Sequence, residues 1–410
     1  MSSLKIVLLG FGTVGEGVYQ TIQTHQNRLQ SLLGKKVEIV GVLVNDINKK
    51  RKIDQHVVIT DDMDDLLEIP DVDVVIEAIV GVEPGYSYVK KSLDKGFHVI
   101  TANKELLANK GKELKKQAVQ NHVRLEYEAA VAGGIPIIST LRHLLRVNRI
   151  TKIEAILNGT SNYILTDITE NQTPFKDALY DAQQKGYAEA DPSNDIDGWD
   201  AFYKLMILSD LLFGTQPSWD SIVHRGIRNV RDVDILAAHS IGCKIKHVAS
   251  LVSEDGDVKL AVEPVVLPSS HALYSVDGVD NAVMVTGDIV GQLQLQGPGA
   301  GALPTASAII EDLVNIYQIK ENVYEESAVS FTSLSESALE DWLVIGLADS
   351  IDSLTIQDKW EISKDGSTTT CWRVTASEAD VQSVVQDQPG VAYYRMNSQF
   401  SEIKSLSTVG

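Results

Sequence analysis

Cysteine is nearly absent from this 410-residue chain, which contains only Cys243 and Cys371. Two cysteines cannot build a disulfide framework or a cysteine-rich metal site. One bridge between them is feasible, but the simpler interpretation is a reduced, cytoplasmic protein. Positive charge is also scarce, because 36 Lys and Arg stand against 56 Asp and Glu, a formal net charge of −20. Nucleic acids and anionic membranes attract clustered cations, so this balance argues against either as a partner.

Long hydrophobic runs are missing as well. The apolar stretch near the N-terminus is broken at Gly10 and lacks the layout of a signal peptide, and no segment is long and apolar enough to span a bilayer. Hydrophobic residues at 44% and charged residues at 22% are ordinary for a globular protein. The length predicts two or three domains, so the composition leaves a soluble, acidic, multidomain protein.

A glycine-rich turn follows the first predicted strand. Residues 4–9 form a short apolar run that fits a strand buried on both faces, and residues 16–33 have helical character. Between them, glycine lets the backbone approach a pyrophosphate at the positive N-terminus of the helix. The order of strand, glycine turn and helix predicts dinucleotide binding, with a tight turn in some other α/β domain as the alternative. The candidate cofactor-binding residues are Gly10, Phe11, Gly12, Thr13, Val14 and Gly15.

The tip of the second predicted strand, residues 37–44, bears on the choice between NAD and NADP. NAD-binding domains usually place an acid there, which accepts hydrogen bonds from the adenosine ribose. This chain has Asn45, followed by Asp46 and by the cations at residues 49–51. A neutral residue with nearby cations favours the 2′-phosphate of NADP, whereas Asp46 can serve NAD. Each cation is explained equally well as part of a solvated charge run.

Predicted strands continue to alternate with predicted helices, which implies a doubly wound parallel sheet of the Rossmann type. The strands are at residues 73–79, 97–101 and 123–127, and the helices at 86–95 and 105–120. Loops at the carboxyl ends of such strands face the cofactor. Ile79 is therefore a candidate neighbour of the nicotinamide, and Lys104 a candidate active-site cation, although a lysine at a helix start is more often a surface residue.

Two further segments are rich in small residues. Residues 128–136 can present backbone carbonyls and, with the carboxylate of Glu128, suit a hard monovalent cation, although composition alone favours a domain hinge. Residues 297–308, which include Gly301, open a predicted helix that extends to about residue 317. Either the backbone N–H groups of this segment approach the cofactor, or its glycines simply permit close packing.

The densest chemistry lies in residues 186–200, which contain five carboxylates, the last of them Asp200 at the start of a predicted apolar helix over residues 200–213. Asp200 and Lys204 are four residues apart and share one helical face. A surface ion pair is the ordinary explanation, but the apolar residues that follow predict a buried helix. A buried lysine beside carboxylates suits proton transfer to a carbonyl oxygen that accepts hydride. A calcium loop fits poorly, because the acids lack its spacing.

In order along the chain, these motifs resemble bacterial homoserine dehydrogenase as far as about residue 320. The matching segments are GFGTVG, TANKELLA, EAAVAGGIPII, NGTSNYIL, GYAEADPSNDIDGWDAFYKL and GPGAGALPTASA. The resemblance implies reversible NAD(P)H-dependent reduction of L-aspartate 4-semialdehyde to L-homoserine, on the route to threonine, isoleucine and methionine. It also implies a Rossmann domain over residues 1–127, completed by about 305–325, and an α+β substrate domain over 128–304 that carries a homodimer contact.

The same resemblance implies roles for individual residues. Lys204 matches the acid/base, Asp200 its partner and a substrate ligand, and Lys104 a second active-site lysine near the cofactor. Glu189 and Asp195 match acids of the substrate site.

The resemblance further implies a sodium or potassium site and a cofactor contact. The cation site comprises Glu128 and the carbonyls of Val131, Gly133 and Ile135, while Gly301 lies in the cofactor-adjacent cluster. At Asn45 the family often has an arginine that contacts the NADP phosphate, so this departure leaves the cofactor preference open.

Two other function classes are weaker. A phosphorylating semialdehyde dehydrogenase needs a cysteine nucleophile near the nicotinamide, and both cysteines lie outside the glycine and lysine motifs. A non-catalytic NADP-binding sensor would not need a lysine among carboxylates.

The region from residue 330 to 410 is less informative. It has predicted strands at 369–375 and 391–396 and a helix at 376–385 between them. This pattern is interpreted as a degenerate or shortened ACT-like regulatory region, with a structural extension as the alternative.

Overall fold

The computed structural model describes residues 3–318, 329–332, 339–346, 351, 354–364, 366–386, 388 and 390–397. These residues form two compact units. The first contains the chain up to Asn148, Tyr203–Gln216 and the segment from Gly297 through helix α12 (Ala302–Gln318). The second contains Arg149–Phe202, Pro217–Gln296 and the described residues from Val329 onward. Within the described ranges, every helix is too short or too polar to cross a membrane.

Six parallel strands form the sheet of the first unit, in the order β3-β2-β1-β4-β5-β6. The strands are β1 (Leu4–Leu9), β2 (Val37–Leu43), β3 (Val58–Thr60), β4 (Val74–Glu77), β5 (His98–Thr101) and β6 (Leu125–Glu126). The helices are α1 (Thr13–Thr24), α2 (Gln26–Leu33), α3 (Met63–Leu67), α4 (Gly85–Asp94), α5 (Lys104–Gln120) and α6 (Ile137–Leu144). The strand order reverses between β1 and β4, so the predicted doubly wound α/β sheet is confirmed.

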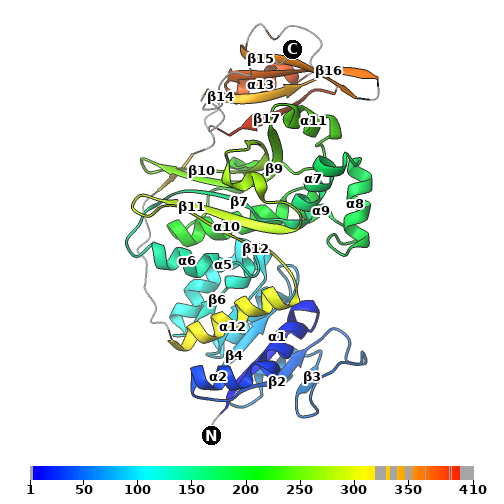
Figure 1. Ribbon diagram of the computed structural model, residues 1–410. Helices are drawn as coiled ribbons and strands as arrows, with labels where there is room; N and C mark the ends of the chain where they lie inside the picture. Colours follow the sequence, from blue (N-terminus) through cyan, green and yellow to red (C-terminus); the bar gives the residue numbers. More distant parts are fainter. Residues whose placement is uncertain are drawn as a thin grey trace. The chain divides into compact units, whose positions relative to one another are not determined.

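Helix α12 lies beside α1 although almost 300 residues separate them in sequence (Figure 1). A Cβ on Gly17 of α1 would come within 2.6 Å of the carbonyl oxygen of Ala302, so glycine permits this contact. The continuous helix expected over residues 16–33 is wrong in one respect, because α1 ends at Thr24 and α2 begins at Gln26. The Gln26 side chain bonds both backbone groups of Val37, at 2.7 and 3.0 Å, which ties the start of α2 to β2.

An eleven-stranded sheet forms the second unit, and its main path runs β12-β11-β7-β9-β10-β17-β14-β16-β15. Its first five members are β7 (Ile150–Ile156), β9 (Cys243–Glu254), β10 (Asp257–Pro268), β11 (Asp280–Gly287) and β12 (Gly291–Pro298). Two short strands, β8 (Val223–His224) and β13 (Ser330–Phe331), pair with β10. Helices α7 (Gly159–Asn171), α8 (Phe175–Gln184) and α11 (Asp232–Ser240) share an apolar core with β9 and β10. Helix α9 (Ser193–Ile196) precedes α10 (Trp199–Phe213), whose later residues belong to the first unit.

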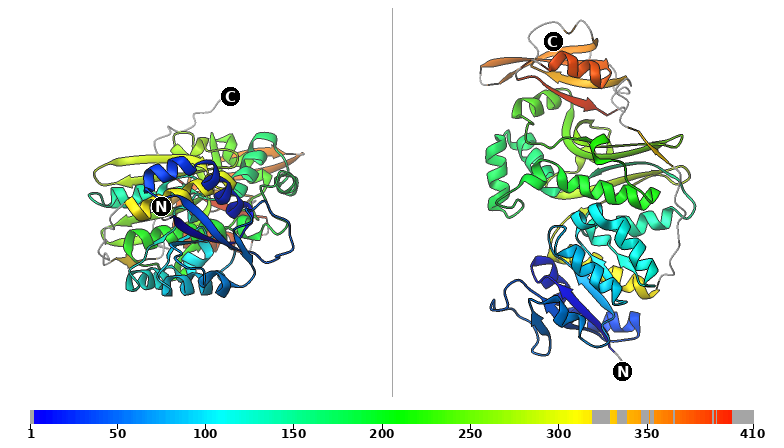
Figure 2. Two further views of the ribbon diagram at one scale, coloured as in Figure 1. Left: turned by 90° about the horizontal axis from the view of Figure 1, so that it is seen from below. Right: turned by 180° about the vertical axis from the view of Figure 1, so that it is seen from behind.

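The C-terminal strands are β14 (Glu340–Ile345), β15 (Thr355–Lys364), β16 (Ser367–Ala376) and β17 (Ala392–Met396). Counted along the chain, they lie in the order fourth, first, third, second, and each neighbouring pair is antiparallel. Helix α13 (Glu378–Val385) lies against this part of the sheet (Figure 2), where Val381 joins a core with Trp342 and Trp372. The predicted elements at 369–375, 376–385 and 391–396 are confirmed, with ends that shift by one or two residues.

Candidate active site

The glycine turn after β1 has a backbone path that side chains would block. Gly10 has φ +97°, and a Cβ there would lie 2.9 Å from the carbonyl oxygen of Ala78. A Cβ on Gly15 would lie only 2.2 Å from the carbonyl oxygen of Gly10, whereas Gly12 has open space. Gly12 is the N-cap of α1 and supplies no side chain to cap it, so this helix end can receive a pyrophosphate. The residues present fit the phosphate-binding end of a dinucleotide.

Two other predicted cofactor residues of the first unit are Phe11, within this turn, and Gly301. Phe11 packs edge-on against Tyr19 of α1, with 5.7 Å between the ring centres. Gly301, with φ +124°, directly precedes α12, whose first residue, Ala302, touches Gly17 of α1. Gly17 therefore permits close packing of α1 against the start of α12, and Gly301 lies at the helix beside the predicted cofactor turn.

Glu77, which the sequence interpretation missed, organises the carboxyl ends of β4 and β5. Its buried carboxylate accepts hydrogen bonds from the Ile79 backbone N–H at 2.7 Å, the Thr101 hydroxyl and, at 3.3 Å, the side-chain amide of Asn103. Burial raises the pKa of Glu77 to about 7, against the lowering effect of these bonds. The available signal is an acid near the end of the strand predicted over residues 73–79, to which no role is assigned from the sequence.

Asn103 connects this cluster to Lys104. Its side-chain oxygen caps α5 by accepting from the Leu106 N–H at 3.0 Å, and its amide donates to the carbonyl of Gly81 at 2.8 Å. Lys104 is the first residue of that helix. Ile79 and Lys104 are therefore fixed at the ends of neighbouring strands, β4 and β5, at the same edge of the sheet as the glycine turn after β1.

The loop after β2 has an exposed Asn45 and an internally bonded arginine. Nη1 of Arg51 donates to the carbonyls of Asp46 and Lys49, at 2.7 and 2.9 Å. The carboxylate of Asp46 accepts from the N–H of Asn48 at 2.9 Å. One cation is thus held on the same loop as Asn45, while Asp46 is engaged in shaping that loop.

The predicted cation segment contains a buried carboxylate at a helix start. Both oxygens of Glu128 accept backbone N–H groups at the first turn of α6, from Ile138 at 2.7 Å and from Ser139 at 2.8 Å. Its own N–H donates to Asp312 of α12 at 2.8 Å. Burial raises the pKa of both acids, and for Asp312 the nearby carboxylates of Glu126 and Glu128 raise it further.

The carbonyls predicted as cation ligands lie on the loop that follows Glu128. Ala132 and Gly133 have φ of +56° and +54°, and a Cβ on Gly133 would meet the carbonyl oxygen of Gly299 at 2.3 Å. The carbonyl of Ile135 already accepts from the N–H of Ile137 at 2.8 Å, while Val131 is fully buried. No group of three or more His, Cys, Asp or Glu with metal-site geometry occurs in the described part of the chain. One carboxylate among carbonyls fits a monovalent cation better than a site for a transition metal.

Asn158 joins two of the predicted substrate acids. From the end of β7, its side-chain amide donates to Asp195 at 2.7 Å and to Asp200 at 2.9 Å. Its oxygen caps α7 by accepting from the N–H of Ser161 at 2.7 Å, and the Ser161 hydroxyl bonds the Asp195 carbonyl at 2.9 Å. In the sequence, Asn158 opens the matching segment NGTSNYIL, but no role is assigned to it. In the structure it holds two carboxylates together, an arrangement whose negative charge can attract a cationic group.

Glu189 lies in an exposed segment between α8 and α9. The side-chain amide of Gln183 holds its carbonyl at 3.0 Å, while the residue itself remains on the surface. Glu189 is thus the most accessible of the predicted substrate acids, and Asp195 is half-buried.

Helix α10 carries Asp200 and Lys204 one turn apart, and both are buried, with exposed fractions of 4% and 7%. Its neighbouring residues Phe202, Leu205 and Met206 are also buried, so the predicted apolar helix is confirmed. Lys204 therefore lies in a largely apolar environment, where a charged side chain is unfavourable unless it is paired.

Two histidines that the sequence did not single out lie under the turn before α10. Gly198 has φ +88°, and a Cβ there would lie 3.1 Å from Nε2 of His224 and 3.2 Å from the ring of His247. Burial lowers the pKa of His247 to about 4, and its Nε2 lies 3.0 Å from the carbonyl of Arg225. These neutral rings support the turn that leads into Asp200.

The thiols are buried and unsuited to nucleophilic chemistry. Cys243 and Cys371 are both free, and burial raises the pKa of each to about 12. Because the thiolate is the nucleophile, neither residue supports a phosphorylating dehydrogenase.

Comparisons with known proteins agree with these features. A family model described as "Homoserine dehydrogenase" matches residues 136–314, and one described as "Homoserine dehydrogenase, NAD binding domain" matches residues 10–128. The homoserine dehydrogenase of Bacillus subtilis is 41% identical over 317 residues, which cover 77% of this chain and 73% of the relative. That of Synechocystis is 42% identical over 332 residues, 80% of this chain and 76% of the relative.

Solved structures extend the likeness over nearly the whole chain. A homoserine dehydrogenase from Thiobacillus denitrificans has a TM-score of 0.88 at 29% identity, covering 97% of this chain and 99% of its own. A hyperthermophilic archaeal homoserine dehydrogenase in complex with NADPH has a TM-score of 0.68 at 28% identity, covering 79% of this chain and 100% of its own.

Proposed function

The chain belongs to the homoserine dehydrogenase family of NAD(P)-dependent oxidoreductases that act on a CH–OH group, and we propose that Lys204 is the acid/base of its reaction. The reaction is the reversible reduction of L-aspartate 4-semialdehyde to L-homoserine in amino-acid biosynthesis. The observation that supports the assignment is the side-chain amide of Asn158, which donates hydrogen bonds to both Asp195 and Asp200. Asp200 lies one helical turn before Lys204 on α10.

The substrate has an α-ammonium group, which carboxylates recognise by charge and hydrogen bonding. Asp195 and Asp200 bind this ammonium, and the exposed Glu189 supplies a third acid. A bound nicotinamide supplies or accepts the hydride. Lys204 polarises the aldehyde oxygen and gives it a proton during reduction, and Lys104 at the start of α5 helps to stabilise the developing negative charge. In the reverse direction, Lys204 removes the proton from the hydroxyl of homoserine.

NADP is the proposed preferred cofactor, with NAD as the alternative. The cofactor is held by the Gly10–Gly15 turn, with Ile79 and Gly301 beside it and Asn45 at the ribose. Support for NADP comes from the neutral Asn45 and from Arg51. The guanidinium of Arg51 donates hydrogen bonds to backbone carbonyls of the loop, which holds its positive charge on the same loop as Asn45. A 2′-phosphate would interact with that guanidinium, whereas a ribose without phosphate would lack the negative charge.

A monovalent cation, Na⁺ or K⁺, is proposed at Glu128 with the carbonyls of Val131, Gly133 and Ile135. Glu128 and Asp312 are both buried, and a nearby cation would offset the cost of burying these carboxylates. A rise in Tm with KCl that choline chloride does not reproduce would support the site. Equal effects of the two salts would contradict it.

A homodimer is proposed, with its contact in the substrate domain over residues 128–304. Strand β12 at the edge of the large sheet is mostly exposed, and the residues just before it include Ile289 and Val290, which are 71% and 40% exposed. Unpaired strand edges and exposed apolar residues are common at contacts between identical subunits. Light scattering that gives the mass of a single chain would contradict this proposal.

The region from residue 330 to 410 is proposed to be a shortened ACT-like regulatory region. Its support is the antiparallel order fourth, first, third, second with α13 on one face, which is the strand order of ferredoxin-like sheets. The remaining assignment is a Rossmann domain over residues 1–127, completed by about 305–325, of which residues 319–325 lie outside the part of the chain that the structure describes.

One assay tests the proposed activity and the cofactor together. The purified chain is given aspartate semialdehyde or unrelated small aldehydes, each with NADPH and with NADH, and cofactor oxidation is followed at 340 nm. We expect turnover with the semialdehyde and a higher kcat/KM with NADPH. Cofactor binding without turnover of the semialdehyde would favour a sensor, and equal turnover of all aldehydes would contradict the substrate assignment.

A further inference from the structure

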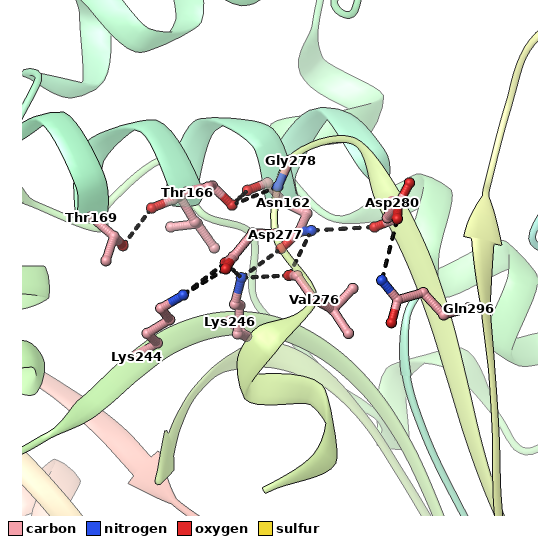
Figure 3. A network of polar contacts seen from close by, with 11 residues as sticks. Asn162, Thr166, Thr169, Lys244, Lys246, Val276, Asp277, Gly278, Asp280 and Gln296 are labelled. Carbon is pink, nitrogen blue, oxygen red and sulfur yellow. Dashed lines mark hydrogen bonds and ion pairs between the residues drawn. The ribbon is translucent and has the colours of Figure 1, made fainter. Parts of the chain in front are cut away.

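A buried lysine of the second unit has no place in the mechanism above. Lys246 lies near the start of β9, and its side chain is 2% exposed. An ammonium group in such a place is unfavourable unless all its donors are used. Figure 3 shows that Lys246 points into a polar cluster formed by α7 and by the loop that leads into β11.

All three N–H groups of the Lys246 ammonium have acceptors. Its Nζ lies 2.6 Å from the carbonyl of Val276, 2.7 Å from the carboxylate of Asp277 and 3.2 Å from the side-chain oxygen of Asn162. Two of these acceptors belong to the loop, and the third belongs to the first turn of α7. The lysine therefore fastens the loop to the helix.

Further bonds join the same two segments. The side-chain amide of Asn162 donates to the carbonyls of Val276 at 3.0 Å and Asp280 at 3.2 Å. The N–H of Gly278 donates to the hydroxyl of Thr166 at 3.1 Å (Figure 3). The loop is thus held against α7 at three successive points.

The fastened loop lies directly against the residue that follows Asn158. A Cβ on Gly159 would come within 2.6 Å of the carbonyl oxygen of Val279, so the loop touches the backbone at the start of α7. Asn158 is the N-cap of that helix, and it donates to both Asp195 and Asp200. A shift of the loop would therefore move the residue that holds the substrate acids.

We propose that Lys246 is a positioning residue, which fixes the Val276–Asp280 loop against α7 and thereby sets the place of Asn158 between Asp195 and Asp200. This proposal rests on the substrate-binding role proposed for those two acids. It predicts an effect on the amino-acid substrate and none on the cofactor, because every residue of the cluster belongs to the second unit.

Lys244 offers a matched control. It lies two residues away on β9 and pairs with the same carboxylate of Asp277, at 2.7 Å. Its Nζ bonds Asp277, whereas Lys246 also reaches Val276 and Asn162. Lys244→Met removes one ion pair from Asp277 and leaves the other contacts of Lys246 in place.

The experiment compares Lys246→Met with Lys244→Met in the full-length chain. We expect Lys246→Met to raise the KM for aspartate semialdehyde about 10-fold or more and to lower kcat/KM by about 100-fold, since small misplacements have effects of this size. The Kd for NADPH, measured by fluorescence titration, should stay within about twofold, and Lys244→Met should stay within about threefold of the original chain in every parameter. Equal effects of the two substitutions, or parallel losses in NADPH and semialdehyde parameters, would overturn the proposal.

Thr166→Val provides a milder test if Lys246→Met does not fold. It removes the hydroxyl that accepts from Gly278 and keeps the shape of the side chain. We expect a rise of about 3- to 10-fold in the KM for the semialdehyde with NADPH binding unchanged, and an unchanged KM would count against the positioning role.

A readout without turnover separates this proposal from the proposed function. Homoserine should raise the Tm of the original chain and of Lys244→Met, but raise that of Lys246→Met or Thr166→Val much less. If the original chain has this shift but no turnover, the catalytic assignment fails. The positioning role then stands when the shift is much smaller in Lys246→Met or Thr166→Val. If it has neither, both proposals fail.

Discussion

The ammonium of Lys115 on α5 forms an ion pair with the carboxylate of Asp210 on α10. Both residues belong to the first unit, and the two helices also carry Lys104 and Lys204. Lys115 lies 4.7 Å from the centre of the Tyr127 ring, whose neighbours include Arg142 at 5.1 Å. Burial alone would lower the pKa of Lys115, but Tyr127 and Asp210 raise it above its ordinary value.

Removing one partner of this pair should destabilise the first unit. Asp210 is 6% exposed and the Lys115 side chain 30%, so Lys115→Met leaves a buried carboxylate without its ammonium. We expect a loss of about 2 kcal/mol in the free energy of unfolding, reduced from the value of a fully buried pair by the exposure of the lysine. Urea unfolding measures it. The double variant Lys115→Met/Asp210→Leu should recover part of the loss, and a double variant less stable than the single one would contradict this account.

Asn158 should be needed for substrate binding for a reason other than helix capping. Asn158→Ala removes the cap and the bonds to both acids, and we expect kcat/KM for the semialdehyde to fall about 100-fold with NADPH affinity unchanged. Asn158→Ser keeps an oxygen to cap α7 but has no amide to bridge Asp195 and Asp200. Stopped-flow or steady-state kinetics of both variants should therefore show similar losses, and normal kinetics for the serine variant would assign the role to capping alone.

Lys204→Ala should remove most turnover while leaving NADPH binding largely intact. General acid–base catalysis by a positioned group contributes about 10²–10⁴-fold to the rate, so kcat should decrease by a factor in this range. Initial rates with saturating semialdehyde give kcat, and fluorescence titration gives the Kd of NADPH. Lys35→Ala, which changes an exposed lysine, is the control and should have normal kinetics. A near-normal kcat in Lys204→Ala would exclude this residue from the chemistry.

Glu77 should make the protein less stable as the pH rises through the range between its unfolded and folded pKa values. The pKa is about 7 in the folded chain, against about 4.5 for an ordinary glutamate in an unfolded chain, so between these pH values the folded chain binds more protons than the unfolded chain. The contribution of Glu77 is therefore most favourable below about pH 4.5 and is lost by about pH 7, with an upper limit of about 3 kcal/mol. Glu77→Gln removes this dependence. Urea unfolding at pH 5 and pH 8 should show the variant gaining stability relative to the original chain at the higher pH, and a constant difference would contradict the raised pKa.

Arg51 should distinguish the two cofactors. Arg51→Ala should weaken NADPH binding about 10-fold and leave NADH nearly unchanged, because only NADPH carries the 2′-phosphate. Arg51→Lys keeps the charge but loses the planar group that bonds the loop carbonyls. If Arg51 acts only by shaping the loop, both variants should weaken NADH and NADPH equally in fluorescence titrations.

Local sequence determined much of the first unit and the chemistry of the second. A run such as residues 4–9 predicts a buried strand, and the glycines after it predict the turn, because both depend on neighbours in the chain. The helix that carries Asp200 and Lys204 is equally predictable from the sequence, since the four-residue spacing and the apolar neighbours are local properties.

Only the tertiary structure decided how distant residues combine. Asn158 meets Asp195 and Asp200 across about 40 positions, and Lys246 meets Asn162 across 84, so no pattern of spacing reveals either contact. The role of Glu77 likewise depends on residues distant in sequence, because Thr101 and Asn103 of the adjoining segment donate hydrogen bonds to its carboxylate. Such contacts depend on strand order and on helix packing, which are set by burial over the whole unit rather than by the residues nearby.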